Sequence, residues 1–194
     1  MPSSYCGERA AQRNRYADAA MIRLETSRLI LRDHEVGDLE AFCAIESDAE
    51  YRAPQVVHPR QELERSFREA WLPPKPLGLW AVECRATSRY IGRCGLYPHR
   101  TDAGVIVPRE LTLGFYIARP DWGRGFATEA GQALIAYAFG SLGTRRIHAG
   151  VHRENARSLR VVTKLGFAFV GPDANPGSPA LEYKIDSPAS DGAA

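Results

Sequence analysis

The chain has 194 residues, of which 44% are hydrophobic and 25% are charged, the proportions of an ordinary globular protein. Its 25 basic and 23 acidic residues give a net charge of +2, which is too small to indicate a nucleic-acid partner or a polybasic membrane anchor. No apolar run approaches the ~18 residues of a transmembrane helix, and the N-terminus lacks the apolar core of a secretory signal. We therefore expect one cytoplasmic domain without nucleic-acid or membrane partners.

Residues 1–20 are polar, rich in Ala and Arg, and have no apolar face. This predicts a flexible tail, a domain over residues 21–186 and a flexible end at 187–194. Met21 opens a strand-like segment, 21–24, and is a candidate start residue. The cysteines show no CxxC spacing and no zinc-type arrangement with histidines, which predicts free thiols and no metal site. They are Cys6, Cys43, Cys84 and Cys94.

Apolar periodicity predicts the secondary structure. Apolar and β-branched runs between turn residues predict strands at 28–32, 77–84, 90–97, 111–117, 146–152, 167–171 and 181–185. Apolar residues at helical spacing predict helices at 38–47, 63–71, 126–139 and 155–166. The segment from Pro98 to Pro108 is expected to be a polar loop. Helices between strands, with several consecutive strands, predict a mixed sheet that carries helices on its faces.

The stretch Arg119–Glu129 joins the 111–117 strand to the 126–139 helix through Gly123 and Gly125. Such a turn directs free backbone N–H groups and the positive end of a helix dipole at one point, which suits a phosphate. The two glycines permit positive φ angles and the close approach of a ligand. A turn that binds no ligand is the alternative.

Two familiar phosphate motifs fit this turn poorly. A Walker loop needs a lysine directly after its last glycine, but Gly125 is followed by Phe126 and Ala127. A dinucleotide-binding turn needs a third glycine, and Thr128 stands in its place.

The run Trp122–Ala130 (WGRGFATEA) resembles the W-G-x-G-[YF]-A-T-E-A pyrophosphate turn of GCN5-related N-acetyltransferases (GNATs) of the RimJ/RimL type, which acetylate ribosomal-protein N-termini. Leu24–Arg32, Gly78–Leu96 and Val151–Phe167 resemble that branch in the same order. The resemblance implies a GNAT fold of the α/β (α+β mixed) class, with a mixed, mostly antiparallel sheet of about seven strands flanked by four helices. It also implies acetyl-CoA as co-substrate and direct attack by a primary amine in a ternary complex.

The resemblance further implies where CoA binds. The pyrophosphate contacts the glycine turn, the pantetheine arm pairs as an extra strand along residues 115–118, and Asn155 bonds this arm. Arg124 as a solvated loop residue and Asn155 as a simple helix N-cap are the alternatives. The implied cofactor-binding residues are Phe115, Tyr116, Ile117, Trp122, Gly123, Arg124, Gly125, Phe126, Ala127, Thr128, Asn155 and Ser158.

Three residues are candidates for catalysis. In this branch a serine at the position of Ser158 assists the departing thiolate, although a hydroxyl that bonds only the backbone is the alternative. The family often carries Glu at the position of Thr112. Because Thr112 is not acidic, the candidate bases are Glu110, on the same strand face, and Glu182 on the last strand, with a water relay as the third option.

A weak base favours an α-amine as the acceptor. An α-amino group with a pKa of about 7.7–8.0 is partly neutral near pH 7.4, whereas a lysine amine with a pKa near 10.4 needs roughly 4 kcal/mol to lose its proton. The expected acceptor is therefore a protein N-terminus or a small-molecule amine. A non-catalytic acyl-CoA-binding regulator is the alternative, and an NTP-binding module is disfavoured. The chain is expected to be a monomer or a homodimer.

The histidines carry no assigned role in the sequence. His148 and His152 share a strand face and are expected to be surface or half-buried residues. His34, His58 and His99 are expected in loops or near helix starts.

Overall fold

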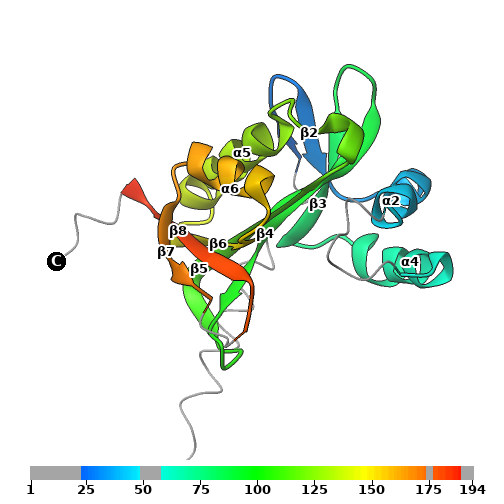
Figure 1. Ribbon diagram of the computed structural model, residues 1–194. Coiled ribbons are helices and arrows are strands. Elements are labelled where there is room, and N and C mark those ends of the chain that lie inside the picture. Colours follow the sequence, from blue (N-terminus) through cyan, green and yellow to red (C-terminus); the bar gives the residue numbers. More distant parts are fainter. Residues whose placement is uncertain (1–22, 49–57, 174–176, 189–194) are drawn as a thin grey trace, which may run out of the picture.

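In the computed structural model, which describes residues 23–48, 58–173 and 177–188, eight strands form one sheet in the order β1-β2-β3-β4-β5-β6-β8-β7 (Figure 1). All neighbouring strands are antiparallel except β5 and β6. The strands are β1 (Leu24–Glu25), β2 (Leu29–Arg32), β3 (Gly78–Cys84), β4 (Arg89–Arg100), β5 (Ile106–Ile117), β6 (Arg146–His152), β7 (Ala168–Pro172) and β8 (Ala180–Asp186). The mixed, mostly antiparallel sheet is confirmed, and the short β1 completes the eight strands.

The four expected helices are also present. They are α2 (Leu39–Glu46), α4 (Arg60–Ser66), α5 (Phe126–Gly140) and α6 (Ala156–Lys164). Short turns η1 (Val36–Asp38), η2 (Phe67–Trp71) and η3 (Arg119–Asp121) accompany them. Among the described ranges, no helix is long and apolar enough to cross a membrane.

Helices α5 and α6 cover one face of the sheet, and α2 and α4 cover the other (Figure 1). Buried Trp80 and Val82 on β3 join the larger core, which α5 and α6 complete. Ala81, between them in sequence, joins the smaller core beneath α2 and α4. Because successive strand residues point to opposite faces, a strand covered on both sides carries a continuous apolar run, as β3 does from Leu79 to Val82.

The second helix differs from the regular pattern expected for it. Leu63 and Phe67 are buried as expected, but Ala70 is exposed. The reason is the π turn η2, in which the Leu72 N–H bonds the Phe67 carbonyl at 2.8 Å. The wider turn rotates the last residues away from the position that a regular α-helix would give them.

The prediction of a loop from Pro98 to Pro108 is wrong. β4 continues to Arg100 and β5 begins at Ile106, so residues 101–105 alone connect them. Pro98 is tolerated because the strand register shifts between Pro98 and Arg100, where the missing N–H is not needed for the ladder. His99 consequently lies on a strand, and not in a loop.

The chain ends are described in part. Residues 1–22, which include the expected tail, Met21 and the first half of the 21–24 segment, lie outside the described residues, as do residues 189–194. At the start of the expected loose end, the Ser187 N–H donates to the Arg145 carbonyl at 2.9 Å.

Candidate active site

The parallel strands β5 and β6 separate partway along their length. They pair over three residues, and Thr112 with His148 is the last pair. Beyond this point β5 stays paired with β4 as far as Ile117, while β6 stays paired with β8 as far as His152. The facing edges of the two strands therefore diverge and leave backbone groups for a ligand to pair with. The predicted pantetheine contacts, residues 115–117, lie on this edge of β5.

The glycine turn lies between the end of β5 and the start of α5. Gly123 has φ +75°, and Gly125, the N-cap residue of α5, has φ +81°. No side chain among the described residues caps this helix, so the N–H groups of its first turn, including Phe126, Ala127 and Thr128, are available to an anion. A Cβ atom built on Gly123 would meet nothing within 4 Å, so the turn faces open space.

Glu129 fixes the turn to the start of the sheet. It accepts hydrogen bonds from the hydroxyls of Thr26 (2.6 Å) and Ser27 (3.1 Å), and from the backbone N–H (2.9 Å) and Nε (2.6 Å) of Arg28. Arg28 also donates to the carbonyl oxygen of Arg124 at 3.0 Å. Burial raises the pKa of Glu129, but these hydrogen bonds outweigh burial and the pKa is lowered. The ionised carboxylate therefore holds the turn in place.

Arg124 is held within the turn. Its guanidinium donates to Asp121 at 2.7 Å and lies 4.7 Å from the centre of the Phe126 ring. Asp121 is buried, and its second oxygen accepts from Arg89 at 2.8 Å. The predicted phosphate partner is thus positioned at the turn by an ion pair, with about half of its side chain exposed.

The N-terminus of α6 lies beside the same turn. The guanidinium carbon of Arg157 is 4.2 Å from the centre of the Trp122 ring, and the Trp122 indole donates to the Ile117 carbonyl at 2.7 Å. Asn155 is the N-cap of α6, as predicted, because its side-chain oxygen accepts from the Ser158 N–H at 3.0 Å. Ser158 is half-buried in the first turn. Two helix N-termini therefore lie close to the separation of β5 and β6.

A pocket of about 520 Å³ opens at this separation, on the sheet face opposite α5 and α6. Glu182 on β8 lines it, and burial raises the pKa of this carboxyl, with Asp173 and Asp102 adding to the effect. Thr112 lines it as well. The other lining residues are Tyr97, Pro98, His99, Arg100, His148 and Gly150.

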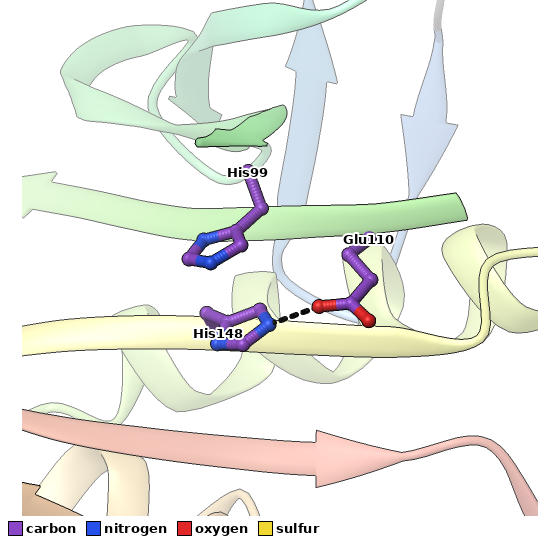
Figure 2. Close-up of side chains that lie close together, drawn as sticks. All are labelled: His99, Glu110 and His148. Atoms are coloured by element: carbon purple, nitrogen blue, oxygen red, sulfur yellow. Dashed lines mark hydrogen bonds and ion pairs between the residues drawn. The ribbon is translucent and has the colours of Figure 1, made fainter. Parts of the chain in front are cut away.

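Glu110, the other acidic candidate, does not line the pocket but lies in a cluster with His99 and His148, which do (Figure 2). One carboxylate oxygen of Glu110 is 2.6 Å from His148 Nε2, and the other accepts from Arg145. The two imidazole rings are stacked, with centres 3.6 Å apart and planes 5° apart. His99 Nδ1 is 3.2 Å from the hydroxyl of Thr112.

Of the three members, the sequence pointed to Glu110 as a candidate base but to neither histidine, because the three residues come from different strands. The only hint was the absence of the family's acidic residue at Thr112, which left a base to be found elsewhere. His148 was expected to be a surface or half-buried residue and is half-buried, but its partners follow from the strand register.

Comparison with known proteins assigns the family. Residues 28–168 match the family model described as Acetyltransferase (GNAT) domain. The chain is 31% identical, over 157 residues, to an uncharacterized N-acetyltransferase, p20, of Bacillus licheniformis, covering 78% of this chain and 85% of the relative.

Solved structures agree on the fold. A GNAT-family acetyltransferase from Bacillus anthracis superposes with a TM-score of 0.73 at 20% identity, covering 86% of this chain and 99% of that one. A Vibrio cholerae structure, described as a proposed ribosomal-protein-serine acetyltransferase, has a TM-score of 0.66 at 20% identity and covers 85% of this chain and 97% of its own. The chain therefore belongs to the GNAT family and is an N-acetyltransferase of that family.

Proposed function

We propose that the protein uses acetyl-CoA to acetylate a primary amine, by direct attack of the amine on the thioester in a ternary complex. The observation that carries this proposal is the separation of β5 and β6 after Thr112 and His148. The separation connects the glycine turn, which suits a pyrophosphate, to a pocket on the other face of the sheet. A donor and an acceptor can therefore approach from opposite sides and meet between the strands.

The donor side is assigned as follows. The pyrophosphate of acetyl-CoA binds the N–H groups of residues 123–127, with the dipole of α5 adding to the attraction. The pantetheine arm pairs with the free edge of β5 at residues 115–117. Asn155 contacts the arm, and the hydroxyl of Ser158 donates a proton to the departing thiolate. Both residues start α6, which packs beside the turn through Arg157 and Trp122.

The acceptor side is the pocket. Glu182 offers a carboxylate that attracts a protonated amine, and Thr112 stands where the family often carries Glu. Since an α-amine loses its proton near neutral pH more readily than a lysine does, the favoured acceptor is the α-amine of a protein N-terminus or of a small molecule. The name of the Vibrio cholerae structure is consistent with a RimJ/RimL-type acceptor, a ribosomal-protein N-terminus.

Release of free CoA thiol tests this function. Acetyl-CoA is incubated with the protein and a panel of amines: peptides with free N-termini, the same peptides blocked at the N-terminus but carrying lysine, and small-molecule amines. We expect thiol release with at least one free α-amine and little with the blocked peptides. In thermal unfolding, acetyl-CoA should raise the melting temperature and ATP should not. Stabilisation by ATP alone would contradict the proposal.

A non-catalytic acyl-CoA-binding regulator is the second candidate, and Thr112 in the usual acidic position favours it. Tight acetyl-CoA binding without thiol release across the whole panel would support this alternative over the enzyme.

A further inference from the structure

We propose that His148 is the general base of the acetyl transfer and that Glu110 is its positioning residue. The proposal rests on the proposed function. It assigns the base that the sequence left open, and it gives Glu110 an indirect role in place of direct proton abstraction.

The geometry fixes which nitrogen of His148 carries the proton. Nε2 is 2.6 Å from a carboxylate oxygen of Glu110. An ionised carboxylate only accepts hydrogen bonds, so a neutral His148 must hold its proton on Nε2 and its lone pair on Nδ1. Nδ1 has no partner among the residues that the structure describes, and His148 lines the pocket. The basic nitrogen is thus left for a bound substrate.

Glu110 is held in the ionised state that this role requires. Burial raises the pKa of Glu110, but hydrogen bonds from His148 and Arg145 outweigh burial, so the pKa is lowered. When His148 takes up a proton, the adjacent negative charge stabilises the imidazolium. A buried carboxylate that orients a histidine and stabilises its charged form is the arrangement of the serine-protease triad, here without the serine.

His99 covers the ring of His148 on one side. Burial lowers the pKa of His99, and the neighbouring His148 lowers it further, which favours the neutral form of His99. Its ring excludes water from one face of His148, while Thr112 lies 3.2 Å from its Nδ1.

Other charged or titratable side chains also surround His148. Arg100 is on β4, Arg145, Arg146 and His152 are on or next to β6, Glu182 and Lys184 are on β8, and Asp102 and Asp173 lie in neighbouring turns. Among the described residues, Glu110 is the one that bonds the imidazole of His148 directly.

The cluster also has the donor types of a metal site, but its geometry favours a base. His148 already uses Nε2 on Glu110, and Arg145 and Arg146 lie beside the same carboxylate, where they repel a cation. The two rings are stacked and nearly parallel, so their nitrogen lone pairs lie in two parallel planes, whereas two histidine ligands must point at one ion.

The reaction then proceeds with all protons accounted for. His148 Nδ1 takes one proton from the ammonium group held near Glu182. The neutral amine attacks the carbonyl carbon of acetyl-CoA, forming the C–N bond, and the C–S bond breaks. His148 releases this first proton to solvent and takes the second amine proton at Nδ1 as the intermediate collapses. Ser158 gives its hydroxyl proton to the thiolate of CoA and is reprotonated from solvent. The net products are the acetylated amine, free CoA thiol and one proton released to solvent.

The test compares His148→Gln with a matched control, His152→Gln. His152 lies four residues further along β6. His152 does not line the pocket. We expect kcat/KM of His148→Gln to fall about 10²-fold or more, with acetyl-CoA affinity retained. The wild-type rate should rise with pH through an ionisation that His148→Gln lacks. His152→Gln should behave as wild type. A His148→Gln rate within about twofold of wild type, with the same pH profile, would overturn the proposal.

Glu110→Gln distinguishes positioning from a merely structural role. The amide of Gln can donate to Nε2, which moves the proton of His148 to Nδ1, the wrong nitrogen for the reaction. We expect kcat to fall at least tenfold, by analogy with carboxylate-to-amide changes in triads, while the KM for acetyl-CoA is unchanged. The acidic limb of the pH profile should move to lower pH because the imidazolium loses its carboxylate partner.

A readout that does not need activity completes the test. ¹⁵N NMR of the histidines, assigned with His148→Gln, should show the Nε2–H tautomer for His148 in the wild-type protein. An Nδ1–H tautomer, or activity that is removed by EDTA and restored by Zn²⁺, would reject the base. If the wild-type protein transfers acetyl groups but the variants and the NMR tautomer differ from these expectations, only the assignment of His148 as the base is wrong. If no amine supports thiol release, the proposed function itself is wrong.

Discussion

Thr112 and His148 are the last paired residues of the parallel strands β5 and β6. Beyond this pair the strands diverge, and the facing backbone edges of β5 and β6 are no longer paired with each other. Both residues point to the pocket face, while their neighbours Leu111 and Ile147 point into the core beneath α5 and α6. The same point of the sheet therefore ends the strand pairing and begins the pocket, which is why we propose that donor and acceptor meet there.

Gly123→Ala tests the turn as an acetyl-CoA site. A Cβ atom at φ +75° strains the backbone by about 1–2 kcal/mol and occupies the space in front of the turn. Gly104→Ala is a matched control, since Gly104 has φ +74° and also has no neighbour within 4 Å of an added Cβ. We expect similar losses of stability in both variants, but a rise of about tenfold in the KM for acetyl-CoA in Gly123→Ala alone, which corresponds to about 1.4 kcal/mol of binding free energy. Equal KM values would contradict the assignment.

Glu129→Gln should lower the free energy of unfolding at pH 7 by about 1–3 kcal/mol, because several hydrogen bonds lose their ionised acceptor. The folded-state pKa of Glu129 is lowered relative to about 4.3 in the unfolded chain, so its contribution is present above that pH and is lost as the pH falls through the folded value. Urea unfolding at pH 7 and at pH 3.5 measures this. The difference from wild type should shrink at the lower pH. Exposed Glu69→Gln serves as the control and should change little at either pH.

Ser158→Ala tests the assistance to the leaving thiolate. Removal of the hydroxyl should lower kcat by about 10²-fold, while the dissociation constant of acetyl-CoA changes little, because the N-cap bond uses the Ser158 backbone N–H and not its hydroxyl. Steady-state kinetics and calorimetric binding separate the two effects. Ser141→Ala, at the C-terminal end of α5, is the control. An unchanged kcat in Ser158→Ala would show that the thiolate needs no proton donor from this position.

Trp122→Phe tests the link between β5, the turn and α6. The variant loses the indole bond to the Ile117 carbonyl, which should cost about 1 kcal/mol of stability and weaken acetyl-CoA binding. Trp71→Phe also loses an indole hydrogen bond, to Ser66, but Trp71 packs against the smaller core and makes no contact with the turn that the structure shows. Both variants should be less stable, and Trp122→Phe alone should bind acetyl-CoA more weakly in titration calorimetry. Equal binding by both would show that Trp122 has only a structural role.

Local sequence patterns predicted most of the elements. The apolar stripe of α5, the N-cap at Asn155 and the glycine turn follow from interactions between residues close in the chain, and the structure contains each of them. The π turn before Leu72 and the long β4–β5 hairpin were missed. In both places the packing of distant residues overrides the local pattern, which reads Ala70 as a core residue and Pro98 as a loop residue.

By itself the sequence determined the glycine turn, because Gly123, Gly125 and the first turn of α5 are contiguous and bring their own N–H groups together. The proposed base, in contrast, depends on residues that are distant in the sequence. His99, Glu110 and His148 come from β4, β5 and β6, and their contact depends on the register of two strand pairs. A shift of one residue in either pair would turn these side chains to the opposite face of the sheet, so only the tertiary structure decided that they meet at the pocket.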